Sequence, residues 1–234
     1  MFRAGTIIAA VTTACAALSL STALAAETCD HFEELLTTTP APPHTAGPWK
    51  LYYQKLAAIQ PGNYDLLLIG DSLADAWPAD SLSPLQVANF GIGGDETQNV
   101  LWRLASPELA KLKPRKVLVV IGTNNLGAGN PPCATVAGIN KIIEKVRETW
   151  PSAQIAFLEI PPRGTAGFKF NNDWRLETNA AVGHIKGVTT INVDNAITCN
   201  WHVPCENYAD DNSHFSQAGY QILGKAVKAA LFQN

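Results

Sequence analysis

Short apolar runs alternate with amphipathic stretches along most of the chain. The apolar runs are rich in Leu, Ile and Val, a composition that predicts strands buried on both faces. The amphipathic stretches carry the apolar periodicity of helices. The predicted strands are Leu66 to Ile69, Val87 to Phe90, Val117 to Ile121, Ile155 to Ile160 and Thr190 to Val193. The predicted helices are Thr97 to Leu104, Val136 to Thr149, Asp173 to Ile185 and Ser216 to Phe232.

Strand and helix alternate regularly, which predicts a five-stranded parallel sheet covered by helices on both faces. We place this α/β domain at residues 61–234, because a chain of 234 residues suffices for one well-packed domain of this class. Residues 28–48 carry several Pro and Thr and are expected to lie on the surface as an arm. An amphipathic helix is expected from Trp49 to Ile59, so residues 27–60 form an N-terminal arm and helix.

The beginning of the chain has the features of a secretory signal peptide. Arg3 precedes the Ala-rich apolar stretch Ile7 to Leu20, and small residues around Ala25 and Ala26 offer a cleavage site. The apolar stretch is too short and too rich in Thr and Ser for a good membrane anchor. Residues 1–26 therefore predict export, to a periplasm or outside the cell, with no membrane segment in the mature chain.

Four of the five cysteines remain after removal of this segment, an even number that favours two disulfides in an exported protein. Four cysteines allow three pairings. The short separation of Cys199 and Cys205 favours that pair, which leaves Cys29 to join the N-terminal arm to Cys133. Unpaired buried thiols are the alternative. A zinc site is less favoured, because no metal-binding spacing of Cys or His is present.

Composition and motifs argue against several partners. The net charge of −3 and the lack of a basic patch argue against binding to nucleic acid or anionic membranes. Glu96 stands where a dinucleotide-binding loop starting at Gly91 would need its last glycine, and no phosphate-binding loop motif occurs. No cofactor or metal is expected. The oligomeric state is not determined by the sequence.

Polar motifs follow the predicted strands, at the edge where parallel sheets place their sites. Ser72 follows the first strand, where α/β enzymes expose a nucleophile. A serine needs a base, and His214 has a carboxylate, Asp211, three residues before it. We expect these two side by side on one helical turn, with Asp210 as the rival partner. His214 alone would more simply be a surface histidine.

Acyl transfer also needs donors for a developing oxyanion. Three candidates are the backbone N–H of Ser72, the N–H of Gly94 and the side-chain amide of Asn124. Each residue has a simpler interpretation, since glycines after strands usually form turns and asparagines usually cap helices.

The order of Ser72, Gly94, Asn124 and the Asp211/His214 pair resembles the SGNH (GDSL) hydrolase family. The resemblance runs from about Tyr64 to Phe232, and the blocks 89–104 and 122–125 are similar to those of the catalytic subunits of platelet-activating-factor acetylhydrolase Ib. It implies a three-layer α/β/α, flavodoxin-like fold and metal-independent ester hydrolysis. It also implies Ser72 as nucleophile, His214 as base, Asp211 as its orienting carboxylate, and Ser72, Gly94 and Asn124 as the oxyanion hole.

Those subunits are intracellular and lack a signal peptide, so their lipid substrate does not transfer to an exported chain. Many family members have Asp where this chain has Asn125. Asp71, Asn125 and Arg163 are candidate substrate contacts, and Arg163 is equally well interpreted as a solvated loop residue. Four aromatic residues could line a groove, although core packing is the favoured interpretation. They are Trp77, Phe168, Phe170 and Trp174.

The expected function is a secreted serine esterase acting on small-molecule or polysaccharide O-acyl esters, with short acyl groups favoured. Activity on longer acyl chains, as a lysophospholipase or thioesterase, is one alternative. A non-catalytic carbohydrate-binding module and an acyltransferase are the others.

Overall fold

The computed structural model describes residues 29–163 and 171–233, together with Met1. Apart from Met1, the predicted signal segment lies outside the described residues, as do Phe168 and Phe170. The described chain forms one five-stranded sheet in the order β2-β1-β3-β4-β5, with every pair parallel. The strands are β1 (Gly62–Gly70), β2 (Val87–Gly91), β3 (Leu112–Val120), β4 (Gln154–Leu158) and β5 (Val188–Ile191). The predicted α/β class and parallel sheet are confirmed.

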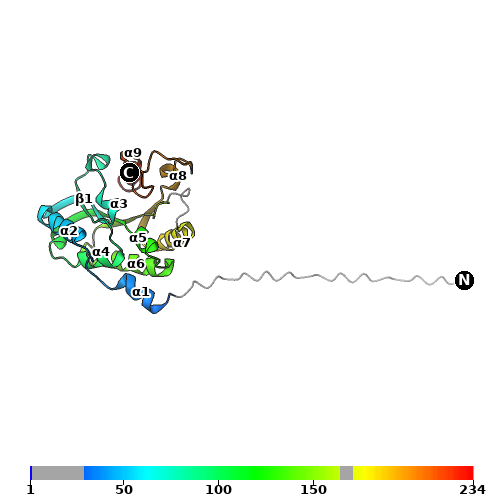
Figure 1. Ribbon diagram of the computed structural model, residues 1–234, viewed down its shortest axis with the longest axis horizontal. Helices are drawn as coiled ribbons and strands as arrows, with labels where there is room; N and C mark the ends of the chain where they lie inside the picture. Colours follow the sequence, from blue (N-terminus) through cyan, green and yellow to red (C-terminus); the bar gives the residue numbers. More distant parts are fainter. Residues whose placement is uncertain (2–28, 164–170, 234) are drawn as a thin grey trace.

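Helices cover both faces of this sheet, giving three layers (Figure 1). On one face pack α2 (Ala46–Ala58), α4 (Thr97–Leu104), α6 (Pro132–Thr149) and α7 (Asn172–Gly183). On the other pack α3 (Ser72–Asp75), α8 (Asp194–Ile197) and α9 (Gln217–Phe232). The remaining helices are α1 (His31–Thr38) and α5 (Thr123–Gly127), with the 3-10 turns η1 (Ala79–Leu82) and η2 (Leu109–Lys111).

Alternation along each strand divides the core between the two faces. In β1, Leu67 and Ile69 join the cluster under α4 and α6, whereas Leu66 and Leu68 join the cluster under α9. All four side chains are 1% exposed or less. Central strands covered on both sides read as continuous apolar runs for this reason, and the runs mark the most buried part of each strand.

The arm expected on the surface contains a helix, α1, that packs against α4 and α6. Periodicity does not reveal α1, because this helix exposes Phe32, Leu35 and Leu36 and buries only Thr37.

Among the described residues, no helix combines the length and apolar character needed to cross a membrane.

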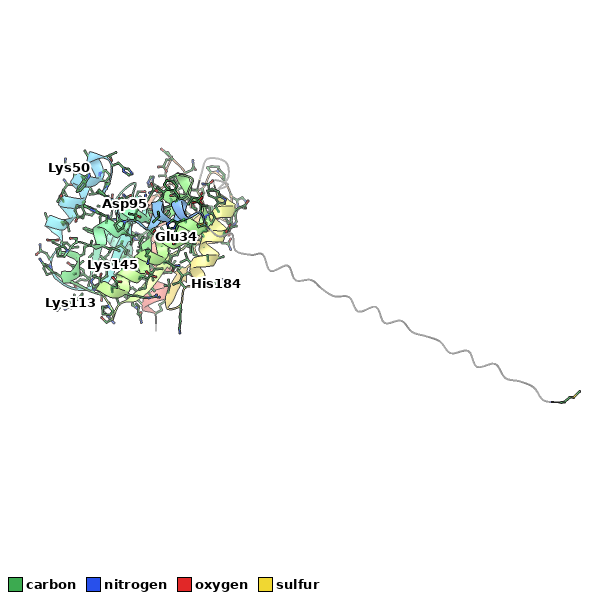
Figure 2. All side chains as sticks on the ribbon, turned by 90° about the horizontal axis from the view of Figure 1, so that it is seen from below. Glu34, Lys50, Asp95, Lys113, Lys145 and His184 are labelled. Carbon is green, nitrogen blue, oxygen red and sulfur yellow. A yellow bond between two sulfur atoms is a disulfide. The ribbon has the colours of Figure 1, made fainter. Side chains whose placement is uncertain are left out.

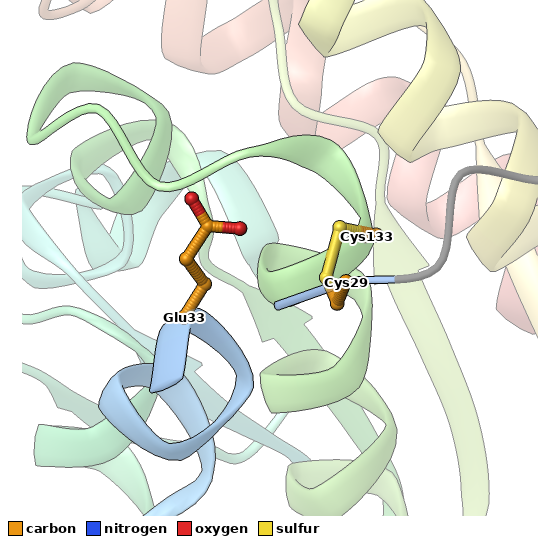
Figure 3. A group of neighbouring side chains, drawn as sticks. All are labelled: Cys29, Glu33 and Cys133. Carbon is orange, nitrogen blue, oxygen red and sulfur yellow. A yellow bond between two sulfur atoms is a disulfide. The ribbon is translucent and has the colours of Figure 1, made fainter. Parts of the chain in front are cut away.

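The described residues contain two disulfides, and both pairings are those favoured by the sequence. Cys29 joins Cys133 with a Cα–Cα distance of 5.6 Å, and Cys199 joins Cys205 at 5.7 Å. The first bridge ties the segment before α1 to the start of α6 (Figure 3). Glu33 lies beside it, and the three ligand-type atoms fall within 4.8 Å of one another. Because both sulfur atoms are consumed in the disulfide, this group lacks the thiolates that would hold a metal.

Candidate active site

Ser72 stands at the junction of β1 and α3, where the strand leaves the sheet. Asp71 is the N-cap of α3, and its carboxylate accepts a hydrogen bond from the N–H of Leu73 at 2.9 Å. Asp71 N–H in turn donates to the carbonyl oxygen of Val120 in β3, at 3.1 Å. The position of Ser72 is therefore fixed from both sides, with its side chain half-buried at the carboxyl edge of the sheet.

Asp211 and His214 lie in a turn between α8 and α9, not in the helical turn expected, so that part of the prediction is wrong. A bridge between Tyr208 and Phe215 closes the base of this turn. Within it, one carboxylate oxygen of Asp211 accepts from the N–H groups of Ser213 and His214, each at 2.9 Å. Such local bonds are a common use of Asp in turns, and they place the other oxygen toward the imidazole.

Ser72, His214 and Asp211 form a continuous hydrogen-bonded chain of side chains, called the relay below. His214 Nδ1 lies 2.6 Å from Asp211 Oδ2, and His214 Nε2 lies 2.8 Å from Ser72 Oγ. Of the two rival carboxylates, Asp211 is the one that contacts His214. Hydrogen bonds from His214 lower the pKa of Asp211 to about 2, so the carboxylate stays charged across the neutral range.

Gly94 lies on the loop that follows β2, and Asn124 lies in the first turn of α5, directly after β3; β2 and β3 are the strands that flank β1. Gly94 has a φ of +83°, a backbone conformation that side chains disfavour, and a Cβ added to it would meet no atom within 4 Å. One N–H of the Asn124 amide donates to the Asp95 carbonyl at 2.9 Å. Because an amide NH₂ has two hydrogens, this bond orients the group and leaves a second donor.

A buried ion pair that we did not predict fixes the loop carrying Gly94. Arg103 in α4 is 1% exposed and contacts Asp95 through Nε at 2.7 Å. The same guanidinium donates to the carbonyls of Phe90 at 2.7 Å and Gly70 at 3.0 Å. It therefore ties the ends of β1 and β2 to the loop. Burial raises the pKa of Asp95 to about 6 even though Arg103 opposes this effect. The sequence signal was weak: Arg103 lies three residues after Val100, at the margin of the apolar face of α4 and not at its centre.

The three expected substrate contacts have different surroundings. Asp71 and Asn125 are both fully buried, which contradicts direct contact with a substrate. Asn125 instead accepts the N–H of Thr97 at the start of α4, at 3.0 Å. Arg163 is half-buried, and burial lowers the pKa of its guanidinium, while the carboxylates of Asp71 and Asp211 oppose the shift. Arg163 thus lies beside the relay in an acidic environment.

Neither aromatic residue that can be placed makes an obvious groove. Trp77 is 5% exposed and belongs to the core, its indole N–H donating to Ser81 at 2.8 Å, which confirms the core interpretation. Trp174 on α7 is exposed.

A cavity of about 630 Å³ lies near Lys113 and Gln154, at the amino ends of β3 and β4. Figure 2 shows Lys113 well away from Asp95, so this cavity is not part of the Ser72 site.

A family model and curated relatives match parts of this chain in sequence. The model of the GDSL-like lipase/acylhydrolase family matches residues 68–222. Human platelet-activating factor acetylhydrolase IB subunit alpha1 is 38% identical over 125 residues, covering 50% of this chain and 53% of that protein. Human subunit alpha2 is 40% identical over 106 residues, covering 43% and 45%. The chain thus spans about half the length of the curated relatives it matches.

Solved structures show the same fold at low sequence identity. A GDSL-like lipase from Bacteroides thetaiotaomicron has a TM-score of 0.62 and 16% identity, covering 79% of this chain and 97% of that one. A catalytic mutant of Axe2, an acetylxylan esterase from Geobacillus stearothermophilus, has a TM-score of 0.59 and 18% identity, covering 75% and 97%. With a family model matching well over half of its length, the chain belongs to the GDSL-like lipase/acylhydrolase family.

Proposed function

We propose that the protein is an exported serine esterase that hydrolyses short O-acyl esters through an acyl-enzyme. The observation that carries this proposal is the relay of two short contacts, 2.8 Å from Ser72 to His214 and 2.6 Å from His214 to Asp211. This geometry supplies a nucleophile, a base within proton-transfer distance and a charged group to orient the base.

In the first half-reaction, Ser72 Oγ attacks the ester carbonyl carbon as His214 Nε2 takes the hydroxyl proton. The ionised Asp211 carboxylate stabilises the imidazolium and holds Nδ1 protonated. The carbonyl oxygen becomes an oxyanion, to which the N–H groups of Ser72 and Gly94 and the second N–H of Asn124 donate. When the tetrahedral intermediate collapses, the bond to the alcohol breaks and His214 protonates the departing oxygen.

In the second half-reaction, water attacks the acyl-serine and His214 again acts as the base. The proton taken from water is returned to Ser72 Oγ as the carboxylic acid leaves. The same donors stabilise the second oxyanion, and each is typically worth ~10²–10³ in rate. The cycle uses only side chains and backbone groups of this chain and one water molecule.

Short acyl groups on sugars or other small alcohols are the substrates that the site favours. Gly94 and Asp211 are exposed and Ser72 and His214 half-buried, so the relay opens directly at the surface, where a bulky alcohol can extend into solvent. The fold shared with an acetylxylan esterase supports this choice. The two disulfides and the predicted signal segment support export, because disulfides persist in oxidising compartments.

Hydrolysis of p-nitrophenyl acetate by the oxidised protein tests the proposal. We expect turnover by the wild-type protein and a loss of at least 10³-fold in kcat in the Ser72→Ala variant, which loses the nucleophile. Asp210→Asn is the matched control, because it removes the neighbouring carboxylate that does not contact His214. Turnover retained in Ser72→Ala would refute the serine mechanism.

A panel of p-nitrophenyl esters and acetylated glycans tests the substrate class. The proposal predicts the highest kcat/KM for acetyl and propionyl groups. A preference for chains of ten or more carbons would instead indicate a lysophospholipase or thioesterase. Products analysed in the presence of an alcohol acceptor separate hydrolysis from acyl transfer, since a transferase would form the new ester.

A further inference from the structure

The segment from Cys29 to Ala41 lies outside the three layers, yet it contacts α6 and α4, the helix that follows the Gly94 loop. Its helix, α1, has only eight residues and leaves Phe32, Leu35 and Leu36 exposed. A helix this short is marginal without tertiary support, and α1 gains little from apolar burial. What holds it are the Cys29–Cys133 disulfide and hydrogen bonds to α4 and α6.

Thr37 forms the contact between α1, α4 and α6. This residue is completely buried, and its hydroxyl donates to the Ala134 carbonyl in α6 at 2.6 Å. Its carbonyl accepts from the hydroxyl of Thr97, the first residue of α4, at 2.9 Å. A Cβ on Gly138 of α6 would lie 2.4 Å from the Thr97 hydroxyl and 2.8 Å from the Thr37 carbonyl. The three helices therefore meet with no free space, and a shift of α1 must move α4.

A second contact links the arm to the same end of α4. The N–H of Ala41 donates to the Gln98 carbonyl at 3.1 Å, and the Asn99 amide donates to the Ala41 carbonyl at 3.0 Å. Asn99 also accepts the N–H of Glu96 at 2.9 Å, closing the capping box of α4. One side chain thus joins the arm to a residue two positions from Gly94.

The start of α4 is also tied to α5, the helix that carries Asn124. Asn125 accepts the N–H of Thr97 at 3.0 Å, and Asn124 donates to the Asp95 carbonyl at 2.9 Å. Residues 94–97 therefore lie between the arm on one side and the start of α5, with Asn124 and Asn125, on the other. The spacing of the two oxyanion donors, Gly94 and Asn124, depends on this arrangement.

We propose that residues 29–41 are a positioning element of the oxyanion hole. The Cys29–Cys133 disulfide holds this segment in place, and the contact between Thr37 and Thr97 couples it to the oxyanion hole. The inference rests on the proposed esterase function. No residue of the arm contacts the substrate in this scheme. Their effect falls on transition-state stabilisation, because a small displacement of an oxyanion donor costs rate without weakening ground-state binding.

Thr97→Val tests the coupling, since it preserves the size of the side chain but removes the hydroxyl that donates to the Thr37 carbonyl and accepts from the Asn125 amide. We expect kcat for p-nitrophenyl acetate to fall about 10-fold, a fraction of the ~10²–10³ that loss of a whole donor costs, with KM changed less than twofold. Thr97→Ser keeps the hydroxyl and should restore kcat to within twofold of wild type. Thr149→Val is the matched control, because the Thr149 hydroxyl donates within its own helix, to the Lys145 carbonyl, at the end of α6 opposite Ala134.

The double variant Cys29→Ser/Cys133→Ser tests the role of the disulfide, with the folded fraction measured by circular dichroism. The same selective loss of kcat is expected. A lower melting temperature with kcat per folded molecule within twofold of wild type, in this variant and in Thr97→Val, would show that the arm is only structural and overturn the inference. If the double variant does not fold, Thr97→Val and Thr97→Ser decide.

Failure of this inference is distinguishable from failure of the proposed function. When the wild-type protein turns over the ester and Ser72→Ala does not, the function stands whatever the arm variants do. A wild-type protein that is folded and oxidised but inactive would overturn both.

Discussion

Replacing Asp71 by Asn should remove a pH dependence from the stability of the protein. The Asp71 carboxyl is completely buried beneath Ser72, with Oδ1 bound to the N–H of Leu73. Its Oδ2 has no hydrogen-bond partner within the described part of the chain. Burial raises its pKa to about 7, with a further upward contribution from Asp95, whereas the Leu73 N–H, Arg163 and His214 act in the opposite direction. Asn preserves the oxygen that caps α3 and cannot ionise.

The sign and size of the effect follow from linkage. In the unfolded chain Asp71 has the ordinary pKa of 3.8, so it is ionised at pH 5 and above. Because the folded pKa is higher, the stability that Asp71 contributes is fully present below pH 3.8 and is lost as the pH rises through 7. Between pH 5 and pH 8.5, this stability is lost mainly over the two pH units from 5 to the folded pKa of about 7. At ~1.4 kcal/mol per pH unit, the loss is roughly 3 kcal/mol.

Urea unfolding followed by tryptophan fluorescence, at pH 5, 7 and 8.5, measures this difference. The free energy of unfolding of Asp71→Asn should rise by roughly 3 kcal/mol relative to wild type between the lowest and highest pH. Any fixed cost of burying the amide shifts the variant equally at all three values. Asp173→Asn, which changes an exposed carboxylate on α7, should run parallel to wild type. Parallel curves for Asp71→Asn as well would refute the assignment of a raised pKa to Asp71.

Three further substitutions test the parts of the site separately. Asn124→Ala should lower kcat by ~10²–10³ with little change in KM, as steady-state kinetics will show, because one oxyanion donor is lost; an unchanged kcat would remove Asn124 from the oxyanion hole. Asp211→Asn should lower kcat by about 10³–10⁴, because His214 loses its charged partner. If kcat instead falls further in Asp210→Asn than in Asp211→Asn, the role belongs to Asp210. Arg103→Met should lower the free energy of unfolding by about 3–5 kcal/mol by leaving Asp95 buried and unpaired. Adding Asp95→Asn should recover part of that loss, and a purely additive double variant would argue against the ion pair.

The parallel sheet could be predicted because its central strands are covered on both faces. Leu66 to Ile69 and Val117 to Val120 are apolar at every position, and the structure buries them all. The same strands begin earlier than predicted, β1 at Gly62 and β3 at Leu112, because their amino ends carry residues such as Lys113 and Arg115 that remain exposed. An apolar run marks the covered part of a strand and not its hydrogen-bonded length.

Features held by long-range contacts were not accessible in the same way. The α1 helix has an inverted pattern, with buried Thr37 and exposed Phe32, since a disulfide and polar contacts hold it in place of an apolar face. The contact between Asp211 and His214 was expected from a helical turn, whereas hydrogen bonds of the Asp211 carboxylate within an irregular turn produce it. Asn125 was expected to contact the substrate, and only the contact between α4 and α5 shows that it is buried.

Labelling with a fluorophosphonate tests the central claim most directly, because this reagent reacts with a serine only when a base and an oxyanion hole activate it. Intact-mass and peptide analysis of the folded, oxidised protein should show one equivalent of label on Ser72, and His214→Ala should abolish it. A folded protein that takes up no label, or takes it up at another residue, would contradict the account.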